Sequence, residues 1–128
     1  MRTNIKGDIG ELIVMTKLLK NDYWVSKPFG DDCPYDILAD NKKGKIVRIQ
    51  VKYVTPKDDL LRCKLFSNTG VSYKDSVDWI LIVNSDTELV YKLDLSEFDS
   101  ETAIYLRLNQ PKNNQTKGVR LAESYLIN

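Results

Sequence analysis

Four residues in the first half of the sequence have side chains suited to acid–base or metal chemistry: Glu11, Asp36, Gln50 and Lys52. The two carboxylates can bind a hard cation such as Mg²⁺ or exchange protons. The lysine can place or stabilise an anionic group, and the neutral glutamine can orient a water but cannot act as a base. These residues form one site only if the fold brings them together.

The composition restricts which other chemistry is available. The chain has no histidine, which removes the commonest general base and the commonest transition-metal ligand. Catalysis must therefore use carboxylates, lysines or hydroxyls, and a catalytic metal should be a hard ion. Cys33 and Cys63 have no CxxC or zinc spacing, so we expect free thiols in a reducing compartment.

Size and charge bound the domain count and the partners. The 128 residues fit one compact domain, and 42% hydrophobic with 29% charged residues indicates a globular chain. The net charge of +1 does not itself indicate binding to nucleic acid, so any DNA binding must rely on a local basic patch. No apolar run reaches the roughly 18 residues of a membrane span and no signal peptide begins the chain, so we expect a cytoplasmic protein.

Asn4 to Asn21 has the periodicity of an amphipathic helix. One face of this helix collects five apolar residues and a threonine, namely Ile5, Ile9, Leu12, Ile13, Leu19 and Thr16. Glu11 falls elsewhere on the helical wheel, between Leu18 and Met15. A carboxylate bordered by apolar groups needs compensation, either from a surface lysine or from a functional partner.

A β-hairpin is predicted to carry the other three residues. Tyr35 to Ala39 forms a short strand, a turn follows at 40–44, and Lys45 to Thr55 forms a long strand. Alternation in the long strand puts Gln50 and Lys52 on one face, opposite a face made of Val47, Ile49, Val51 and Tyr53. Considered singly, Asp36 fits a turn aspartate, and Gln50 and Lys52 fit a solvated face.

The remaining pattern completes an α/β domain around one sheet. Further strands are predicted at 23–27, 61–66, 79–83, 89–93 and 103–108, with a weak helix at 119–127. The continuous apolar run at 79–83 is typical of a strand covered on both faces. In the hairpin, the Asp36 side chain and the backbone carbonyl of Val51 can converge on a hard cation, with Lys52 adjacent.

At these residues the sequence resembles the PD-(D/E)xK nuclease superfamily. Tyr35-Asp36 matches the first half-motif, with Pro34 one place earlier than the strict pattern. Gln50-Val51-Lys52 matches the second half-motif with glutamine in place of the acid, and 7–11 resembles the segment that carries the helix glutamate. The likeness is closest to the small homing endonucleases of bacterial group I introns, and it extends through 73–79 and 106–115.

This resemblance implies a Mg²⁺-dependent DNA endonuclease, with Mn²⁺ as a substitute. It implies a single PD-(D/E)xK nuclease domain over 1–128, restriction-endonuclease-like, with a mixed central β-sheet flanked by helices. Glu11, Asp36 and the Val51 carbonyl would bind the metal, Gln50 would help to place a water and Lys52 would assist attack. A Holliday junction resolvase or restriction-type nuclease, and an inactive DNA-binding or assembly module, stay open as alternatives.

Contact with DNA and assembly are further expectations. A polar, basic stretch near the C-terminus suits groove readout or equally a solvated loop; it contains Lys112, Asn113, Asn114, Gln115, Lys117 and Arg120. The group Lys57, Arg62 and Lys64 is less persuasive, because Asp58 and Asp59 offset its charge. Two symmetric cuts in duplex DNA need two sites, which favours a homodimer or a higher homo-oligomer.

Overall fold

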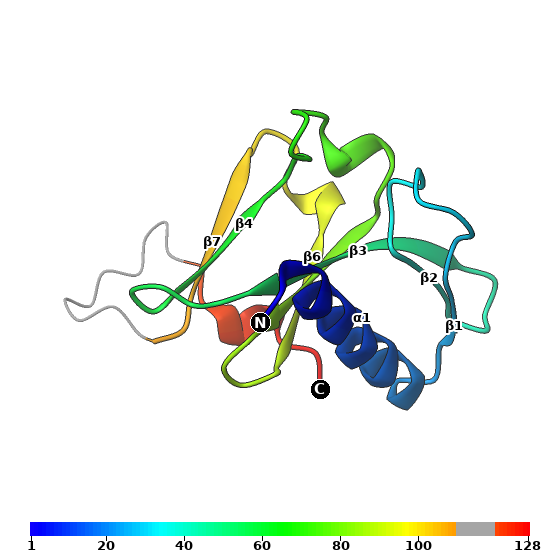
Figure 1. Ribbon diagram of the computed structural model, residues 1–128, viewed down its shortest axis with the longest axis horizontal. Coiled ribbons are helices and arrows are strands. Elements are labelled where there is room, and N and C mark those ends of the chain that lie inside the picture. The colour runs from blue at the N-terminus through cyan, green and yellow to red at the C-terminus, as the bar shows by residue number, and fades with distance from the viewer. Residues whose placement is uncertain (110–119) are drawn as a thin grey trace.

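A five-stranded sheet and one long helix dominate the structure (Figure 1). The computed structural model describes residues 1–109 and 120–128. Helix α1 is Thr3–Lys20, and the sheet has the order β1-β2-β3-β5-β6. Its strands are β1 (Trp24–Ser26), β2 (Ile37–Asp40), β3 (Ile46–Val54), β5 (Trp79–Asn84) and β6 (Val90–Asp94). Outside this sheet, β4 (Leu60–Lys64) and β7 (Ala103–Arg107) form a two-stranded ribbon.

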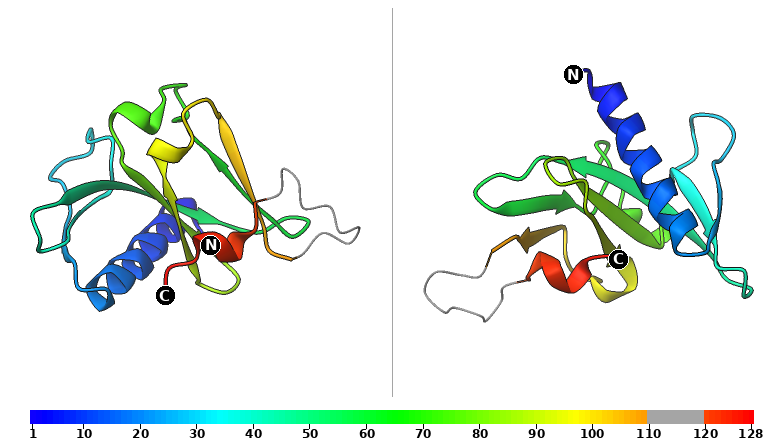
Figure 2. Two further views of the ribbon diagram at one scale, coloured as in Figure 1. Left: turned by 180° about the vertical axis from the view of Figure 1, so that it is seen from behind. Right: turned by 90° about the horizontal axis from the view of Figure 1, so that it is seen from below.

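The sheet is mixed, as the sequence predicted. β3 and β5 run parallel, whereas the pairs β1–β2, β2–β3 and β5–β6 are antiparallel. All six residues of β5 are buried, which confirms a strand covered on both faces. Two hydrophobic clusters account for this, because α1 covers one face and the β4–β7 ribbon with its adjoining loops covers the other (Figure 2).

Alternation along β3 divides its side chains between these two clusters. Val47 and Ile49 are buried with α1 and β2, while Gln50 and Lys52 point to the ribbon side of the sheet. The predicted alternation is confirmed. Helices were expected on both faces of the sheet. In the described residues the face opposite α1 instead carries the ribbon and two short 3-10 turns, η1 (Tyr73–Asp75) and η2 (Leu95–Glu97). The weak C-terminal helix is reduced to one such turn, η3 (Ala122–Tyr125).

Helix α1 buries a different face from the one that the apolar pattern suggests. Gly10, Val14 and Leu18 are buried, whereas Leu12 and Leu19 are each 60% exposed. The cause is the crossing point with β3, where a Cβ on Gly10 would lie 3.2 Å from the Tyr53 Cβ. The helix therefore rests on its smallest residue, and the stripe i, i+4, i+8 from that residue becomes the contact. Because Glu11 follows Gly10, it lies close to the sheet at this crossing.

This close approach gives a stability prediction. Gly10→Val adds bulk against Tyr53 and Val51, so we expect a loss of about 1–3 kcal/mol in the free energy of unfolding. Gly7→Ala is the matched control, because nothing lies within 4 Å of its added Cβ, and it should gain about 0.5–1 kcal/mol from helix propensity. Urea unfolding measures both, and equal stabilisation by the two variants would contradict the crossing.

Two further sequence expectations concern thiols and membranes. Cys33 and Cys63 are both free, and burial raises the pKa of the Cys63 thiol to about 11. No helix among the described residues is long and apolar enough to cross a membrane.

Candidate active site

The two strands of the hairpin separate at the point where Asp36 lies. Their pairing ends at Ile37 and Ile49, while β3 continues to Val54 with only β5 beside it. Asp36 therefore precedes β2 rather than lying within a strand, which corrects the predicted 35–39 boundary. Its backbone N–H still donates to the carbonyl of Ile49 at 2.8 Å, so the residue is held at this fork.

The Asp36 side chain turns toward the open edge of β3. Its Oδ2 accepts a hydrogen bond of 2.9 Å from the backbone N–H of Val51. Because the N–H and C=O of one strand residue point to the same edge, the Val51 carbonyl also points to the Asp36 side. The Val51 carbonyl and the Asp36 carboxylate are therefore on the same edge of β3.

Burial raises the pKa of the Asp36 carboxyl above its ordinary value. The hydrogen bond from Val51 opposes this shift, while the negative charge of Glu11 raises the pKa further. Lys52 and Lys27 lower it through their positive charges. The ionised form of this carboxyl is thus less favourable than it would be in water, and Glu11 is close enough to contribute to that penalty.

Glu11 reaches the fork from the helix layer. Its Oε1 accepts a hydrogen bond from the ammonium of Lys27, and its side chain is 20% exposed. The bond with Glu11 raises the pKa of Lys27, and Asp36 adds to that shift through its charge. Glu11 therefore has the lysine partner that the sequence left open, and that lysine is also close enough to Asp36 to respond to its charge. Lys27 was not predicted from the sequence, because it follows β1 with no motif around it.

Lys52 is held from the ribbon side of the sheet. Its Nζ donates a hydrogen bond of 2.9 Å to the hydroxyl of Tyr73 and lies 4.9 Å from the centre of that ring. Tyr73 is only 8% exposed and begins η1, where Ser72 caps the turn by accepting from the backbone N–H of Lys74. The lysine therefore has a fixed partner on a buried ring, which the sequence pattern did not reveal.

A pocket joins three of these residues. It encloses about 280 Å³ and is lined by Asp36, Gln50 and Tyr73, with Cys33, Pro34 and the loop residues Ser67, Val71, Ser72 and Ser76. Gln50 thus shares a cavity with Asp36, while Lys52 adjoins it through Tyr73. The four predicted site residues meet at one fork, three from the hairpin and one from α1.

The donor set at the fork fits a hard divalent cation. Asp36, Glu11 and the Val51 carbonyl supply oxygen ligands, the type that Mg²⁺ prefers. Glu11 raises the pKa of Asp36, and a cation between the two carboxylates would relieve that repulsion. Among the described residues no group of three or more acidic, histidine or cysteine side chains gathers to hold a metal, so the carbonyl is needed to complete the set.

A family model described as PD-(D/E)XK endonuclease matches the chain over residues 1–128. The chain belongs to the PD-(D/E)XK endonuclease family. Membership implies a nuclease, and nucleases of this family generally use divalent metal ions. No curated protein sequence matches the chain.

Two solved structures share the fold of this PD-(D/E)XK chain. The bacterial homing endonuclease I-Ssp6803I is 23% identical with a TM-score of 0.74, covering 98% of this chain and 86% of that one. Hjc, a Holliday junction resolvase from the archaeal hyperthermophile Archaeoglobus fulgidus, is 17% identical with a TM-score of 0.52, covering 94% and 95%. Both likenesses support a restriction-endonuclease-like fold.

The predicted DNA-binding residues have a different outcome. Lys112, Asn113, Asn114, Gln115 and Lys117 lie outside the described residues. Arg120 is described: its guanidinium bonds to Glu101 and lies 5.2 Å from the ring centre of Phe98. Arg120 therefore has a structural partner, and its contact with DNA stays a prediction.

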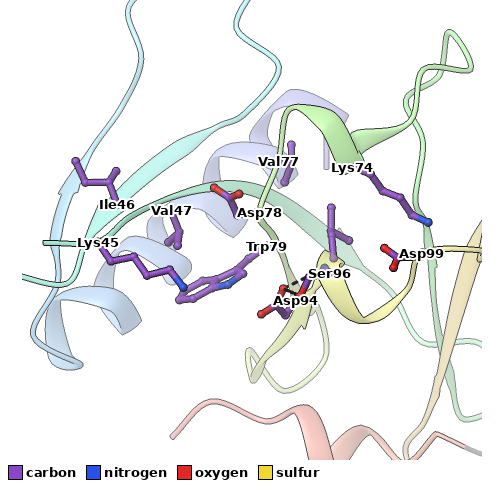
Figure 3. Close-up of a pocket in the computed structure, with 11 residues that line it drawn as sticks. Lys45, Ile46, Val47, Lys74, Val77, Asp78, Trp79, Asp94, Ser96 and Asp99 are labelled. Carbon is purple, nitrogen blue, oxygen red and sulfur yellow. Dashed lines mark hydrogen bonds between the residues drawn. The ribbon is translucent and has the colours of Figure 1, made fainter. Parts of the chain in front are cut away.

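A second cavity lies at the other end of β3 and carries no comparable site (Figure 3). It encloses about 330 Å³ beside Asp78, Asp94 and Asp99. Asp94 accepts from the backbone N–H of Ser96 as the cap of η2. Asp78 bonds to Arg48, and this bond lowers the pKa of Asp78. These two carboxylates already have partners within the fold, which makes them weaker candidates for metal ligands than the carboxylates at the fork.

The Lys52–Tyr73 contact predicts a positioning role for the tyrosine. Tyr73→Phe removes the hydroxyl acceptor and keeps the ring, so we expect about tenfold slower DNA cleavage, the size of one charged hydrogen bond. Single-turnover rates measure this, with Tyr23→Phe as the control, because the half-buried Tyr23 ring lies against Trp79 between α1 and β1. An unchanged rate in Tyr73→Phe would show that the Tyr73 hydroxyl does not position Lys52 for cleavage.

Proposed function

We propose that this protein is a Mg²⁺-dependent DNA endonuclease of the homing type, which cuts duplex DNA at a specific sequence. The observation that carries the proposal is the Asp36 carboxylate bonded at the open edge of β3, beside Gln50 and Lys52. The fold is nearer to the homing endonuclease I-Ssp6803I than to the junction resolvase Hjc, which supports the homing type.

In this proposal each residue at the fork has one task. Asp36, Glu11 and the Val51 carbonyl hold the ion, which when bound supplies positive charge to the phosphate and makes an attacking water more acidic. Gln50 orients that water through its amide, and Lys52 stabilises the negative charge that builds on the phosphate. Lys27 is bonded to Glu11 in the metal-free chain, so it would have to release this carboxylate for Glu11 to serve as a metal ligand.

Two copies of the chain would act together. One site attacks one phosphodiester at a time, so a double-strand break is simplest for two subunits related by a two-fold axis. We therefore propose a homodimer or a higher homo-oligomer on DNA, with Mn²⁺ able to replace Mg²⁺.

Cleavage assays on three substrates test the function. The protein with Mg²⁺ would be incubated with supercoiled plasmid, with fragments from a random-sequence DNA library, and with a synthetic four-way junction. Recurrent ends at one sequence support the homing type, whereas cleavage confined to the junction would replace it with resolution. Binding of DNA without cleavage under Mg²⁺ and Mn²⁺ would leave an inactive DNA-binding module.

A further inference from the structure

The β4–β7 ribbon presents two faces of opposite character. Its inner face is apolar and at most 3% exposed, made of Leu61, Cys63, Ile104 and Leu106. Its outer face carries the alternate residues, of which Arg62 and Lys64 are exposed and Arg107 is half-buried. Because opposed residues of an antiparallel pair share a face, the register puts Arg62 beside Tyr105 and Lys64 beside Ala103.

Charge on this outer face has one sign. Its six paired positions hold three cations and no acid, in a chain whose net charge is only +1. Asp58 and Asp59, which the sequence suggested would cancel this charge, occupy a tight turn with positive φ between Lys57 and Leu60. They lie at the hairpin tip, outside the six paired positions of the outer face.

Aromatic rings hold the cations along the ribbon. The Arg62 guanidinium lies 5.9 Å from the centre of the Tyr105 ring, and the Lys64 ammonium lies 6.0 Å from that of Phe66. The four ion pairs among the described residues involve other cations, so the charges of Arg62 and Lys64 are available to an external anion. The face is therefore basic, ordered and uncompensated by protein carboxylates.

The ribbon leads directly to the candidate active site. After Lys64 the chain passes Phe66 and reaches Ser67, which lines the pocket shared by Asp36 and Gln50. The Lys64 end of the ribbon is therefore joined to the pocket by a short stretch of chain.

We infer that the outer face of the β4–β7 ribbon binds the major groove of duplex DNA, with Arg62 and Lys64 on the phosphates. This inference rests on the proposed function. The groove is about 12 Å wide and admits a two-stranded ribbon. Five residues per strand span about 17 Å, or half a turn of duplex.

Salt-dependent binding tests the ribbon. A fluorescein-labelled random-sequence DNA duplex of about three helical turns would be titrated by anisotropy in Ca²⁺, and the slope of log K against log salt compared between proteins. Arg62→Gln/Lys64→Gln should reduce the slope by about 2 and weaken binding by about tenfold or more. Arg62→Lys/Lys64→Arg keeps both charges and should retain the slope.

The control variant, Lys20→Gln/Lys43→Gln, removes two exposed lysines elsewhere. Lys20 is on α1, and Lys43 is at the β2–β3 turn. This turn lies across the molecule from the ribbon in Figure 1. Acetylation of the unmutated protein gives an independent reading: DNA should protect Lys64 and leave Lys43 reactive. An unchanged slope in the ribbon variant, or equal acetylation of Lys64 with and without DNA, overturns the inference.

Two outcomes separate this inference from the proposed function. If the unmutated protein neither binds nor cuts DNA, the function itself is wrong. If it cuts DNA and the ribbon variant binds as tightly as the unmutated protein, only the ribbon assignment is wrong. The major groove of duplex RNA is too deep and narrow to admit the ribbon. If the ribbon variant lost as much affinity for duplex RNA as for duplex DNA, the groove assignment would be contradicted.

Discussion

Lys52→Met should slow plasmid cleavage by about 10²–10⁴-fold, the range that one positioned acid–base or charge-stabilising group supplies. Methionine keeps the length of the side chain against Tyr73 but removes the ammonium beside the pocket. The Tyr73 hydroxyl loses its donor, which costs about 1 kcal/mol. That cost is too small to unfold a typical domain, so circular dichroism should report a folded variant.

Lys92→Met is a closely matched control for this substitution. Lys92 also lies on a strand with its ammonium over an aromatic ring, 4.2 Å from the centre of Trp79, but on β6 and away from the fork. It should cut at the rate of the unmutated protein. Equal loss in both lysine variants would show that removing any stacked lysine damages the protein, and full activity in Lys52→Met would exclude that residue from catalysis.

Asp36→Asn should abolish cleavage and yet raise the thermal midpoint of the metal-free protein at neutral pH. The amide oxygen can still accept from the Val51 N–H, so the fork is kept. What disappears is a carboxylate whose ionised form is disfavoured by burial and by Glu11. Active-site residues that serve function at the expense of stability behave in this way.

The stabilisation by Asp36→Asn should depend on pH in a defined direction. The pKa of Asp36 is raised above 3.8 in the folded chain, so on raising the pH the unfolded chain releases this proton first. Unfolding then becomes easier as the pH rises from 3.8 through the folded pKa, and the full penalty applies above it. The difference in midpoint between variant and unmutated protein should therefore be absent below pH 3.8 and largest near neutrality.

Added Mg²⁺ should reverse the order of the two proteins. A ligand at 100 times its dissociation constant stabilises the folded state by about 2.7 kcal/mol. The unmutated protein should gain this increment and Asp36→Asn should not, as measured by scanning calorimetry with and without the ion. An equal Mg²⁺ response in both would mean that the ion binds elsewhere.

Local pattern sufficed to predict the hairpin. Alternation in β3 is a property of adjacent residues, so it identified the face of Gln50 and Lys52 correctly. The apolar run in β5 similarly predicted a strand buried on both faces. Asp36 and the Val51 carbonyl could be paired because a short turn fixes the relation of β2 and β3.

Long-range contacts escaped the same reasoning. The buried face of α1 depends on a crossing at Gly10, which periodicity cannot reveal when apolar residues surround the helix. Tyr73 lies far along the chain from Lys52, and its hydrogen bond exists because η1 folds back over the sheet. Lys27 became visible as the partner of Glu11 only when α1 and the segment after β1 were in place.

The central claim is that one cation pocket lies between Glu11, Asp36 and the Val51 carbonyl. Crystals soaked in Mn²⁺, with data collected at the manganese absorption edge, would locate the ion directly by anomalous scattering. We expect a peak within about 2.0–2.6 Å of an Asp36 carboxylate oxygen and the Val51 carbonyl oxygen, with Lys27 displaced from Glu11. A peak beside Asp78 and Asp94, or none at the fork under conditions where the protein cuts DNA, would contradict it.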